Sequence, residues 1–244
     1  MKGKTALVTG AAGAIGSAVC RFLAEDGLRL ILVDLNEAGI HGLADKLKTE
    51  TYVLPLDVSD HEAVVSGCEK AFAEFGHADV LVNVAGVLSN NKLLQTDPAE
   101  WKHIHEVNLD GPFYLSQLTV PHMKREGWGR IVNISSYAWK SGGVTSGTAY
   151  SSSKAGMVGL TFAVAKEVAE FGVTVNGIAP AYVMSPMVME QLTEEQRQEL
   201  LELIPVHRFS EPDEVAHAVR FLVSPLAAFI TGEIIDMNGG FQFD

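Results

Sequence analysis

Seven short apolar runs recur along the chain, separated by longer amphipathic stretches. The runs are apolar at nearly every position instead of alternating, as expected of parallel strands that are covered on both faces. We therefore predict strands at Thr5–Val8, Arg29–Asp34, Thr51–Leu56, Val80–Val84, Arg130–Ile134, Val173–Ile178 and Ile234–Met237. The stretches between them have the length of helical crossovers, and the clearest are Ile15–Asp26, Asp60–Phe75, Pro98–Arg125 and Ala149–Phe171.

This alternation predicts the fold class. Repeated strand–helix units with right-handed crossovers build an α/β, Rossmann-type doubly wound sheet, here seven-stranded and mostly parallel with helices on both faces. Since no Pro/Ser-rich linker and no internal repeat divides the 244 residues, we expect one domain over 1–244. Only Met184–Pro205 interrupts the alternation of predicted strands and helices. We interpret this segment as a mobile substrate flap or as an ordinary surface helix.

Composition narrows the function classes. A net charge of −12 argues against a general nucleic-acid binder, because it repels phosphate backbones. The only cysteines, Cys20 and Cys68, lie in helix-like stretches, so we expect neither a disulfide nor a metal framework. No apolar run is long enough to span a bilayer, and the first residues lead directly into a strand. We therefore expect a cytoplasmic protein without membrane contact.

A glycine-rich turn joins the first predicted strand to the first predicted helix. Its small residues allow a sharp bend and a close approach of backbone to a pyrophosphate, which then meets the helix N-terminus. The placement between strand and helix is what makes this turn a specific signal for a dinucleotide cradle. The residues predicted to form the cradle are Gly10, Ala12, Ile15 and Gly16.

An acidic residue ends the second predicted strand. Asp34 lies about twenty positions beyond the glycine turn, where the adenosine ribose hydroxyls of a dinucleotide arrive. Its carboxylate would accept their hydrogen bonds and repel a 2′-phosphate, and the following Leu35 offers no compensating cation. The sequence therefore favours NAD over NADP, with a helix N-cap as the alternative role of Asp34.

Tyr150 and Lys154 carry the candidate chemistry. Positions i and i+4 share one helix face, so the phenol and the ammonium can point into one site. We expect the lysine cation, together with a positive nicotinamide ring, to lower the pKa of the phenol so that it can exchange a proton with an alcohol or a carbonyl oxygen. This spacing alone would equally suit a core tyrosine beside a snorkelling lysine.

A serine pair follows the fifth predicted strand. A hydroxyl at this carboxyl end could stabilise charge that develops on the reacting oxygen. Adjacent strand positions face opposite ways, so only one of Ser135 and Ser136 can do so.

Taken in order, these motifs resemble the short-chain dehydrogenase/reductase family, in particular its compact single-domain branch, which includes 3-oxoacyl reductases and secondary alcohol dehydrogenases. The resemblance runs from Thr9-Gly10 to Asn238-Gly239-Gly240. It implies that Asn108, with Ser136, Tyr150 and Lys154, completes a catalytic tetrad, in which Asn108 holds a water linked to Lys154. It further implies cofactor contacts at Asp57, Val58, Asn83, Ala85, Gly86, Tyr150, Lys154, Pro180, Val183 and Ser185.

Three positions depart from the family pattern. Ala181 replaces a glycine that often follows Pro180, and Val84 stands where asparagine or alanine is common. The segment from Ser136 to Tyr150 is one residue longer than usual, which bears on the choice between the two serines. Of the two we predict Ser136 as the catalytic serine. None of these departures removes a reacting group.

We interpret the chain as an NAD-dependent oxidoreductase that transfers hydride between NAD(H) and a secondary alcohol or ketone with an apolar body. The alternatives are a reductase of 3-oxoacyl thioesters, on acyl-carrier protein or CoA, and a non-catalytic NAD-binding sensor. An epimerase or dehydratase is disfavoured, since only about ninety residues follow Tyr150. An acidic carrier could meet the cluster Lys124, Arg125 and Arg130, although Glu170-Phe171 and the net charge oppose it.

Two further expectations concern the residues that contact the substrate and the assembly of the protein. An apolar substrate body would contact residues for which ordinary packing is an equal alternative, namely Leu88, Trp139, Val144, Tyr182, Met184 and Met187. The resemblance implies a homo-oligomer, commonly a homotetramer, paired through Pro98–Arg125 and Ala149–Phe171 with a contribution from Phe241–Asp244.

Overall fold

A computed structural model describes residues 1–185 and 192–243. Within them one seven-stranded sheet has the order β3-β2-β1-β4-β5-β6-β7, and every neighbouring pair is parallel. The strands are β1 (Thr5–Thr9), β2 (Arg29–Asp34), β3 (Thr51–Pro55), β4 (Val80–Asn83), β5 (Gly129–Ile134), β6 (Val173–Pro180) and β7 (Ile234–Met237). The predicted fold class is confirmed, and all seven strands lie within a few residues of their predicted positions.

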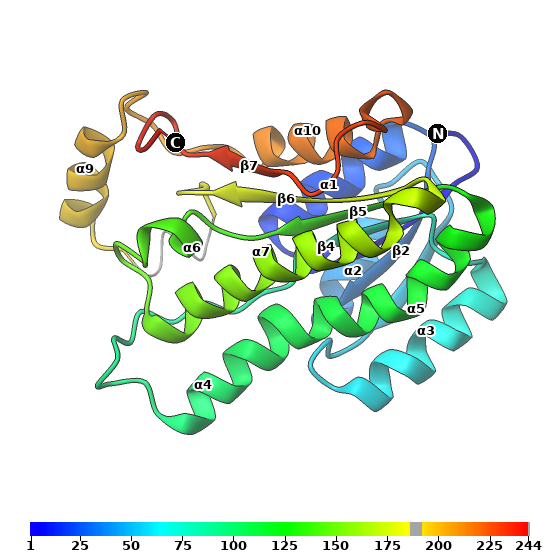
Figure 1. Cartoon of the computed structure of the whole chain (residues 1–244), viewed down its shortest axis with the longest axis horizontal. Helices are drawn as coiled ribbons and strands as arrows, with labels where there is room; N and C mark the ends of the chain where they lie inside the picture. Colours follow the sequence, from blue (N-terminus) through cyan, green and yellow to red (C-terminus); the bar gives the residue numbers. More distant parts are fainter. Residues whose placement is uncertain (186–191, 244) are drawn as a thin grey trace.

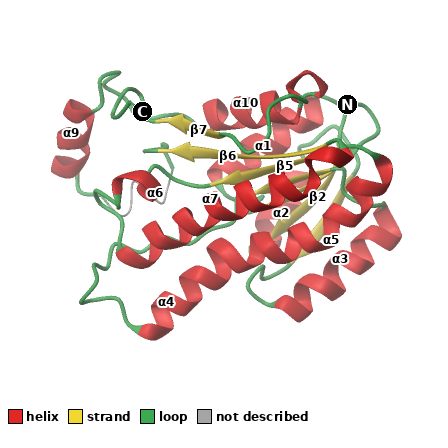
Figure 2. Ribbon diagram, in the orientation of Figure 1, coloured by secondary structure: helices red, strands yellow, loops and turns green. Residues whose placement is uncertain are grey.

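Helices cover both faces of the sheet (Figures 1 and 2). The helices on one face are α1 (Ala14–Glu25), α2 (Glu37–Ala44) and α10 (Pro212–Val223). The other face carries α3 (His61–Phe75), α5 (Gly111–Glu126) and α7 (Thr148–Val168). The remaining described helical segments are α4 (Pro98–His105), η1 (Glu106–Asp110), α6 (Ala138–Ser141), η2 (Ala169–Phe171), α9 (Glu194–Leu203) and η3 (Pro225–Ala227).

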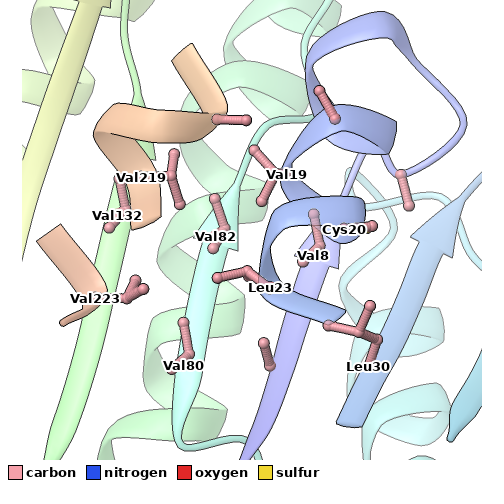
Figure 3. Close-up of a cluster of buried hydrophobic side chains, with 14 of the residues drawn as sticks. Val8, Val19, Cys20, Leu23, Leu30, Val80, Val82, Val132, Val219 and Val223 are labelled. Carbon is pink, nitrogen blue, oxygen red and sulfur yellow. The ribbon is translucent and has the colours of Figure 1, made fainter. Parts of the chain in front are cut away.

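The continuous apolar runs follow from this double coverage. Successive strand side chains point to opposite faces, so Ala6 and Val8 of β1 join the core under α1 and α10, while Leu7 joins the core under α3 and α5. Figure 3 shows the first of these cores, where side chains of α1 and α10 meet those of the central strands. Burial of both sets anchors the sheet, because each buried aliphatic side chain contributes about 1.5–3 kcal/mol.

The order of the strands positions the site. Chain order reverses between β1 and β4, and ligands of doubly wound sheets bind outside the carboxyl ends of the strands at such a switch point. In Figure 1, α6 and α9 lie beyond the arrowheads of β6 and β7, whereas the N-terminus lies at the opposite end of the sheet. The loops after β1, β4, β5 and β6 therefore open toward one edge.

One helical prediction needs correction, and another lies partly outside the described residues. The stretch Pro98–Arg125 is not one uniform α-helix, because the π-helical segment η1 separates α4 from α5. In the described part of Met184–Pro205 the regular element is α9, which begins with a capping box between Thr193 and Gln196. The part of the predicted flap over 186–191, including Met187, lies outside the described residues, so its mobility stays a prediction.

Two further features concern the described part of the chain. None of its helices combines the length and apolar character needed to cross a bilayer. In residues 1–185 and 192–243, no group of three or more His, Cys, Asp or Glu side chains is placed to hold a metal ion.

Candidate active site

The turn after β1 is shaped by glycines that no other residue could replace. Gly10 has a φ of +63°, and a Cβ atom there would lie 2.9 Å from the Ala85 amide nitrogen. A Cβ atom on Gly16 would lie only 2.0 Å from the Gly10 carbonyl oxygen. The first turn of α1 therefore packs directly against the loop that precedes it, as the predicted cradle requires.

The N-terminus of α1 is open in the way a phosphate site requires. Its N-cap, Gly13, provides no side-chain acceptor, and the first turn contains no acidic residue. The amide N–H groups of this first turn, which includes Ile15 and Gly16, can therefore face an anion instead of a capping side chain. These residues fit the pyrophosphate of a dinucleotide.

Asp34 is fixed by two backbone donors. The Ala12 amide donates to its Oδ2 atom over 2.9 Å, and the Asn36 amide donates to its Oδ1 atom over 2.9 Å. The carboxylate is thereby tied to the glycine-rich turn at the end of β2. The alternative that Asp34 caps the next helix is wrong, because the N-cap of α2 is Asn36, whose side chain accepts from the Gly39 amide.

The predicted adenine-side residues differ in exposure. Leu35 is 71% exposed beside Asp34, so its side chain is free to cover a flat ring. Asp57 accepts from both the amide and the hydroxyl of Ser59, which orients the turn after β3. Val58 is buried, and its atoms would contact a Cβ atom placed on Gly111.

The turn after β4 is organised by a threonine that sequence reasoning missed. The Thr9 hydroxyl accepts hydrogen bonds from the amides of Val84 and Ala85, both over 3.0 Å. The side chain of Asn83 is fully enclosed and donates to Asn133, which in turn donates to Thr161 of α7. Asn83 can therefore contact a cofactor only through its backbone, and its side chain links the sheet to α7.

The predicted nicotinamide-side residues, Pro180, Val183 and Ser185, all line one cavity with Ile15. Backbone hydrogen bonds hold this segment: the Ser210 amide donates to the Tyr182 carbonyl over 2.9 Å, and the Met184 amide donates to the Ser210 carbonyl over 2.8 Å. The segment after β6 is therefore held against the chain that precedes α10.

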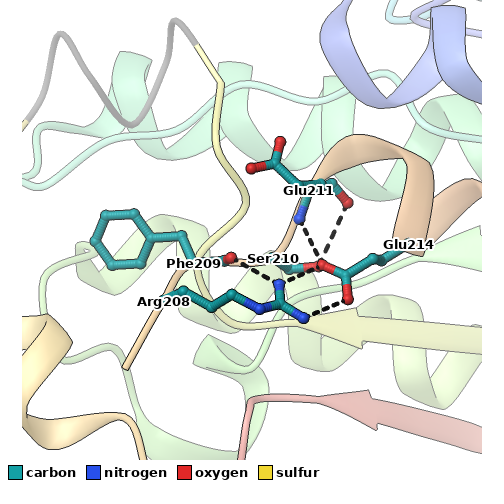
Figure 4. Close-up of polar contacts among 5 residues, drawn as sticks. All are labelled: Arg208, Phe209, Ser210, Glu211 and Glu214. Carbon is teal, nitrogen blue, oxygen red and sulfur yellow. Dashed lines mark hydrogen bonds and ion pairs between the residues drawn. The ribbon is translucent and has the colours of Figure 1, made fainter. Parts of the chain in front are cut away.

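An ion pair anchors that preceding chain, as Figure 4 shows. Both terminal nitrogens of Arg208 donate to the Glu214 carboxylate, over 2.6 and 2.8 Å. The same carboxylate accepts from the Glu211 amide at the start of α10, and these bonds hold the pKa of Glu214 down at about 2. Nothing in the sequence pattern singled out this pair.

Ser136, and not Ser135, is brought to Tyr150. Ser136 lines the same cavity as Tyr150, at the start of α7, and hydrogen bonding from Ser136 acts to lower the pKa of the phenol. The Ser135 hydroxyl instead donates to the backbone carbonyl of Lys154 over 3.0 Å. The longer segment between Ser136 and Tyr150 is accommodated by α6 and a loop, so it does not displace either residue.

Lys154 and Asn108 lie behind the phenol. Lys154 is only 3% exposed, donates to the Ile134 carbonyl over 2.8 Å, and lies 5.8 Å from the centre of the Tyr150 ring. Asn108, fully buried in η1, accepts from the Val87 amide and donates to the Val87 carbonyl and the Ser153 hydroxyl. A Cβ atom on Gly86 would contact both side chains, so a glycine keeps this space open.

Burial shifts the pKa values of Tyr150 and Lys154 in opposite directions. Burial raises the pKa of Tyr150, and the Ser136 hydrogen bond offsets this only in part. Burial lowers the pKa of Lys154 to about 8. In the ligand-free site the pKa of the phenol is therefore shifted upward. The expected lowering of this pKa by Lys154 together with a positive nicotinamide ring stays a prediction for the site with its cofactor bound.

The cavity in front of Tyr150 is partly apolar and partly rich in hydroxyl groups. Of the predicted substrate contacts, Leu88, Val144 and Tyr182 line it, whereas Trp139 and Met184 do not. The lining also includes residues that the sequence did not single out, namely Asn90, Ser141, Thr145, Ser146 and Leu192.

The predicted basic cluster does not form a surface beside this cavity. Arg130 is 2% exposed, donates to the carbonyls of Gly129 and Gly172, and stacks on the Trp128 ring. It lies near the amino end of β5, opposite the carboxyl edge of the sheet. The prediction that Arg130 faces an acidic carrier is therefore wrong, because its guanidinium is buried in the fold.

Comparisons with known proteins agree with this geometry. A family model described as Enoyl-(Acyl carrier protein) reductase, a short-chain dehydrogenase/reductase model, matches residues 10–242. Nodulation protein G of Azospirillum brasilense is 39% identical over 247 residues, covering 100% of both chains. The 3-oxoacyl-[acyl-carrier-protein] reductase FabG of Vibrio cholerae is 39% identical over 240 residues, covering 98% of each.

A solved structure shows the same likeness in three dimensions. The crystal structure of 3-oxoacyl-[acyl-carrier protein] reductase from Brucella melitensis has a TM-score of 0.93 at 30% identity, and the match covers 99% of this chain and 92% of that one. Fold and sequence similarity therefore extend over nearly the whole chain.

Proposed function

Because the chain belongs to the short-chain dehydrogenase/reductase family, we propose that it transfers hydride between NAD(H) and the carbon of a secondary alcohol or ketone. Members of this family are oxidoreductases that act on C=O or CH–OH groups with a nicotinamide dinucleotide. The observation that carries the proposal is the cavity wall shared by Ser136 and Tyr150, with the Lys154 ammonium 5.8 Å from the centre of the Tyr150 ring.

The roles follow from the positions of these side chains. When bound, the nicotinamide ring supplies or accepts the hydride. In reduction, the hydroxyls of Ser136 and Tyr150 donate hydrogen bonds to the carbonyl oxygen, and Tyr150 then transfers its proton to that oxygen. The Lys154 ammonium stabilises the phenolate left behind. The enclosed Asn108 fixes η1 beside Lys154, and oxidation follows the same path in reverse.

The protonated phenol of the ligand-free site is the form that reduction of a carbonyl requires. A proton donor must hold its proton before hydride arrives, and burial keeps Tyr150 in that form. Oxidation would need the phenolate, which forms more readily once a positive nicotinamide ring lies beside it.

Asp34 supports NAD as the cofactor. Its carboxylate is held at the end of β2 by the amides of Ala12 and Asn36, where the adenosine ribose of a bound dinucleotide would lie. A 2′-phosphate would meet a fixed negative charge there. The neighbouring Leu35 and Asn36 supply no cation.

Reduction of a 3-oxoacyl thioester is the second candidate. The names of the FabG relatives, 39% identical over nearly the whole chain, favour it. The net charge of −12 and the burial of Arg130 disfavour an acidic carrier protein, so CoA-linked or free substrates are the better match. Pairing between copies through α5 and α7, which expose Phe113 and Phe162, stays a prediction of this proposal.

Initial-rate assays test the function directly. Oxidation of NADH or NADPH would be followed by absorbance with a panel of ketones, acetoacetyl-CoA and an acetoacetyl carrier protein. The proposal expects turnover of ketones with NADH that is lost in Tyr150→Phe and kept in Tyr52→Phe, since Tyr52 bonds Glu74 on the far edge of the sheet. Turnover restricted to the carrier-linked substrate would favour the second candidate, and binding of NADH without any turnover would contradict both.

A further inference from the structure

Two hydroxyl groups meet on the cavity wall without contributing to the chemistry described above. The phenol oxygen of Tyr182 lies 3.4 Å from the hydroxyl oxygen of Thr145, and both residues line the cavity that contains Tyr150. They come from separate parts of the fold, the segment after β6 and the loop before α7. Their convergence is therefore a property of the tertiary structure.

Each hydroxyl is held in place by its surroundings. The Tyr182 backbone accepts from the Ser210 amide, and its ring packs against Phe209 and Phe241 at centroid distances of 5.7 and 6.5 Å. The loop that carries Thr145 is fixed by the Lys92 ammonium, which donates to the Gly143 and Ser146 carbonyls over 3.2 and 2.7 Å. Neither group needs to reorganise to meet a ligand.

The hydroxyls of Tyr182 and Thr145 have more donor hydrogens than their mutual contact uses. Two hydroxyls bring two donor hydrogens, and the contact between them uses one, whichever oxygen is the acceptor. Within the part of the chain that the structure describes, neither hydroxyl has another hydrogen-bond partner. One donor hydrogen therefore remains for an acceptor in the cavity. Burial raises the pKa of Tyr182, so that its phenol also keeps its proton.

The charge of the cavity defines the kind of acceptor. Among its described lining residues Lys154 is the only cation, and it lies behind Tyr150 instead of beside Tyr182; no Asp, Glu, Arg or His contributes. The guanidinium of Arg208, on the other side of the Ala181–Tyr182 wall, is paired with Glu214. A neutral oxygen would satisfy the free donor, whereas a carboxylate would find no partner charge there.

From these observations we infer that Tyr182 and Thr145 bind a second, neutral oxygen of the substrate, as in a keto ester, diketone or hydroxyketone, and so determine specificity. This inference rests on the proposed function and narrows its substrate class. The reacting carbonyl faces Ser136 and Tyr150, and the second oxygen accepts from the Tyr182–Thr145 pair. Monoketones leave that donor unpaired when they exclude water from the cavity.

A matched substrate pair tests the inference. Ethyl 3-oxobutanoate and 2-heptanone have chains of equal length, but only the ester carries a second oxygen. Because the ester is intrinsically more electrophilic, the informative quantity is the change in the ratio of kcat/KM values between wild-type protein and variant. In Tyr182→Phe we expect kcat/KM for the ester to fall about tenfold and that for 2-heptanone to stay within about twofold.

Further variants separate recognition from structure. Thr145→Val should lower the same ratio, and the double variant should lose less than the product of the single losses, because the two hydroxyls act on one oxygen. Tyr52→Phe removes a phenol oxygen far from the cavity and should leave the ratio unchanged. An equal loss on both substrates in Tyr182→Phe, or a ratio that does not change, would overturn the inference.

A binding measurement keeps the test independent of turnover. In the Tyr150→Phe background, loaded with NADH, the Kd values of ethyl 3-oxobutanoate, 2-heptanone and the 3-oxobutanoate anion can be read from NADH fluorescence. We expect the ester to bind tightest and to lose about tenfold on adding Tyr182→Phe. Absence of turnover in the wild-type protein would contradict the proposed function but not this inference. The inference would be contradicted if Tyr182→Phe left the Kd of the ester unchanged, or if the anion bound tightest.

Discussion

The two halves of the site are built by different means. On the dinucleotide side, the fit is made by backbone: Gly10 and Gly16 allow a close approach, and Asp34 is held by two amides. On the reacting side, the fit is made by side chains whose burial shifts their pKa values, upward for Tyr150 and downward for Lys154. Steric constraints thus govern the first half, and desolvation governs the second.

This difference explains why the halves respond differently to change. A backbone cradle tolerates no added atom, because close-packed backbone cannot shift without distorting its neighbours. A desolvated side chain can be replaced by an apolar one of similar shape without loss of fold, while its chemistry disappears. Substitutions in the two halves should therefore separate stability from activity.

The largest structural effect is expected from Gly16→Ala. The new Cβ atom would lie 2.0 Å from the Gly10 carbonyl oxygen, so the loop or α1 must move, at a cost of about 3 kcal/mol or more. Thermal unfolding and NADH titration should show both a lower Tm and loss of binding. Gly42→Ala is the control, because its Cβ atom would meet nothing within 4 Å in α2. Unchanged NADH affinity in Gly16→Ala would contradict the cradle.

Lys154→Met should separate stability from activity on the reacting side, because we expect the variant to be more stable than the wild-type protein and inactive. Burial lowers the pKa of Lys154 to about 8, below its unfolded value, so the charged lysine destabilises the fold at every pH below about 8. This penalty fades as the pH rises from about 8 toward the unfolded pKa. We expect about 2 kcal/mol of added stability at pH 7, measured by urea unfolding, and a smaller gain at pH 10.

The wild-type enzyme should show the same titration in its kinetics. With Lys154 charged, kcat/KM for ketone reduction should be level below about pH 8 and decline above it. A profile that stays flat to pH 10 would contradict the role given to Lys154.

Asp34→Asn should change cofactor choice without changing the fold. The amide oxygen can still accept from a backbone N–H, but the charge that repels a 2′-phosphate is gone. We expect the preference for NADH over NADPH to fall about 30-fold, roughly 2 kcal/mol. Asp45→Asn, just after α2, serves as control. A wild-type protein that prefers NADPH would refute the assignment of NAD.

Glu214→Gln should have the smallest effect. The Arg208–Glu214 pair is 57% and 41% exposed, so solvent screens it and we expect its loss to lower the stability only slightly. Because the pKa of Glu214 is lowered, this contribution is present above its unfolded pKa and disappears as the pH falls toward about 2. The KM for NADH should rise a few-fold, with Glu69→Gln on the exposed face of α3 as control. A drop in kcat without a change in KM would argue against an anchoring role.

The sequence predicted what depends on local pattern. Buried parallel strands leave continuous apolar runs, and a glycine-rich turn placed between a strand and a helix is specific for a phosphate cradle. The sheet and the cradle around Gly10 and Gly16 were therefore predicted. Tyr150, Lys154 and the pair Ser135/Ser136 were singled out from their spacing and position, and Asn108 through the family resemblance; the structure brings Tyr150, Lys154, Ser136 and Asn108 together around one space.

What the sequence could not predict depends on burial and on contacts between distant segments. Arg130 looks like a surface cation in sequence, yet the fold encloses it against Trp128. The π-helical segment around Asn108 interrupts a stretch whose composition suits a regular helix. The pKa of Tyr150 depends on how much water its ring loses, and the contact between Thr145 and Tyr182 joins residues 37 positions apart.

The central claim is that the phenol of Tyr150 delivers the proton that accompanies hydride. The most direct test is kcat/KM for ketone reduction by Tyr150→Phe, with NADH affinity and Tm measured on the same preparation. The account predicts a loss of about 10²–10⁴-fold with affinity and Tm nearly unchanged. Turnover within a few-fold of the wild-type protein would contradict it.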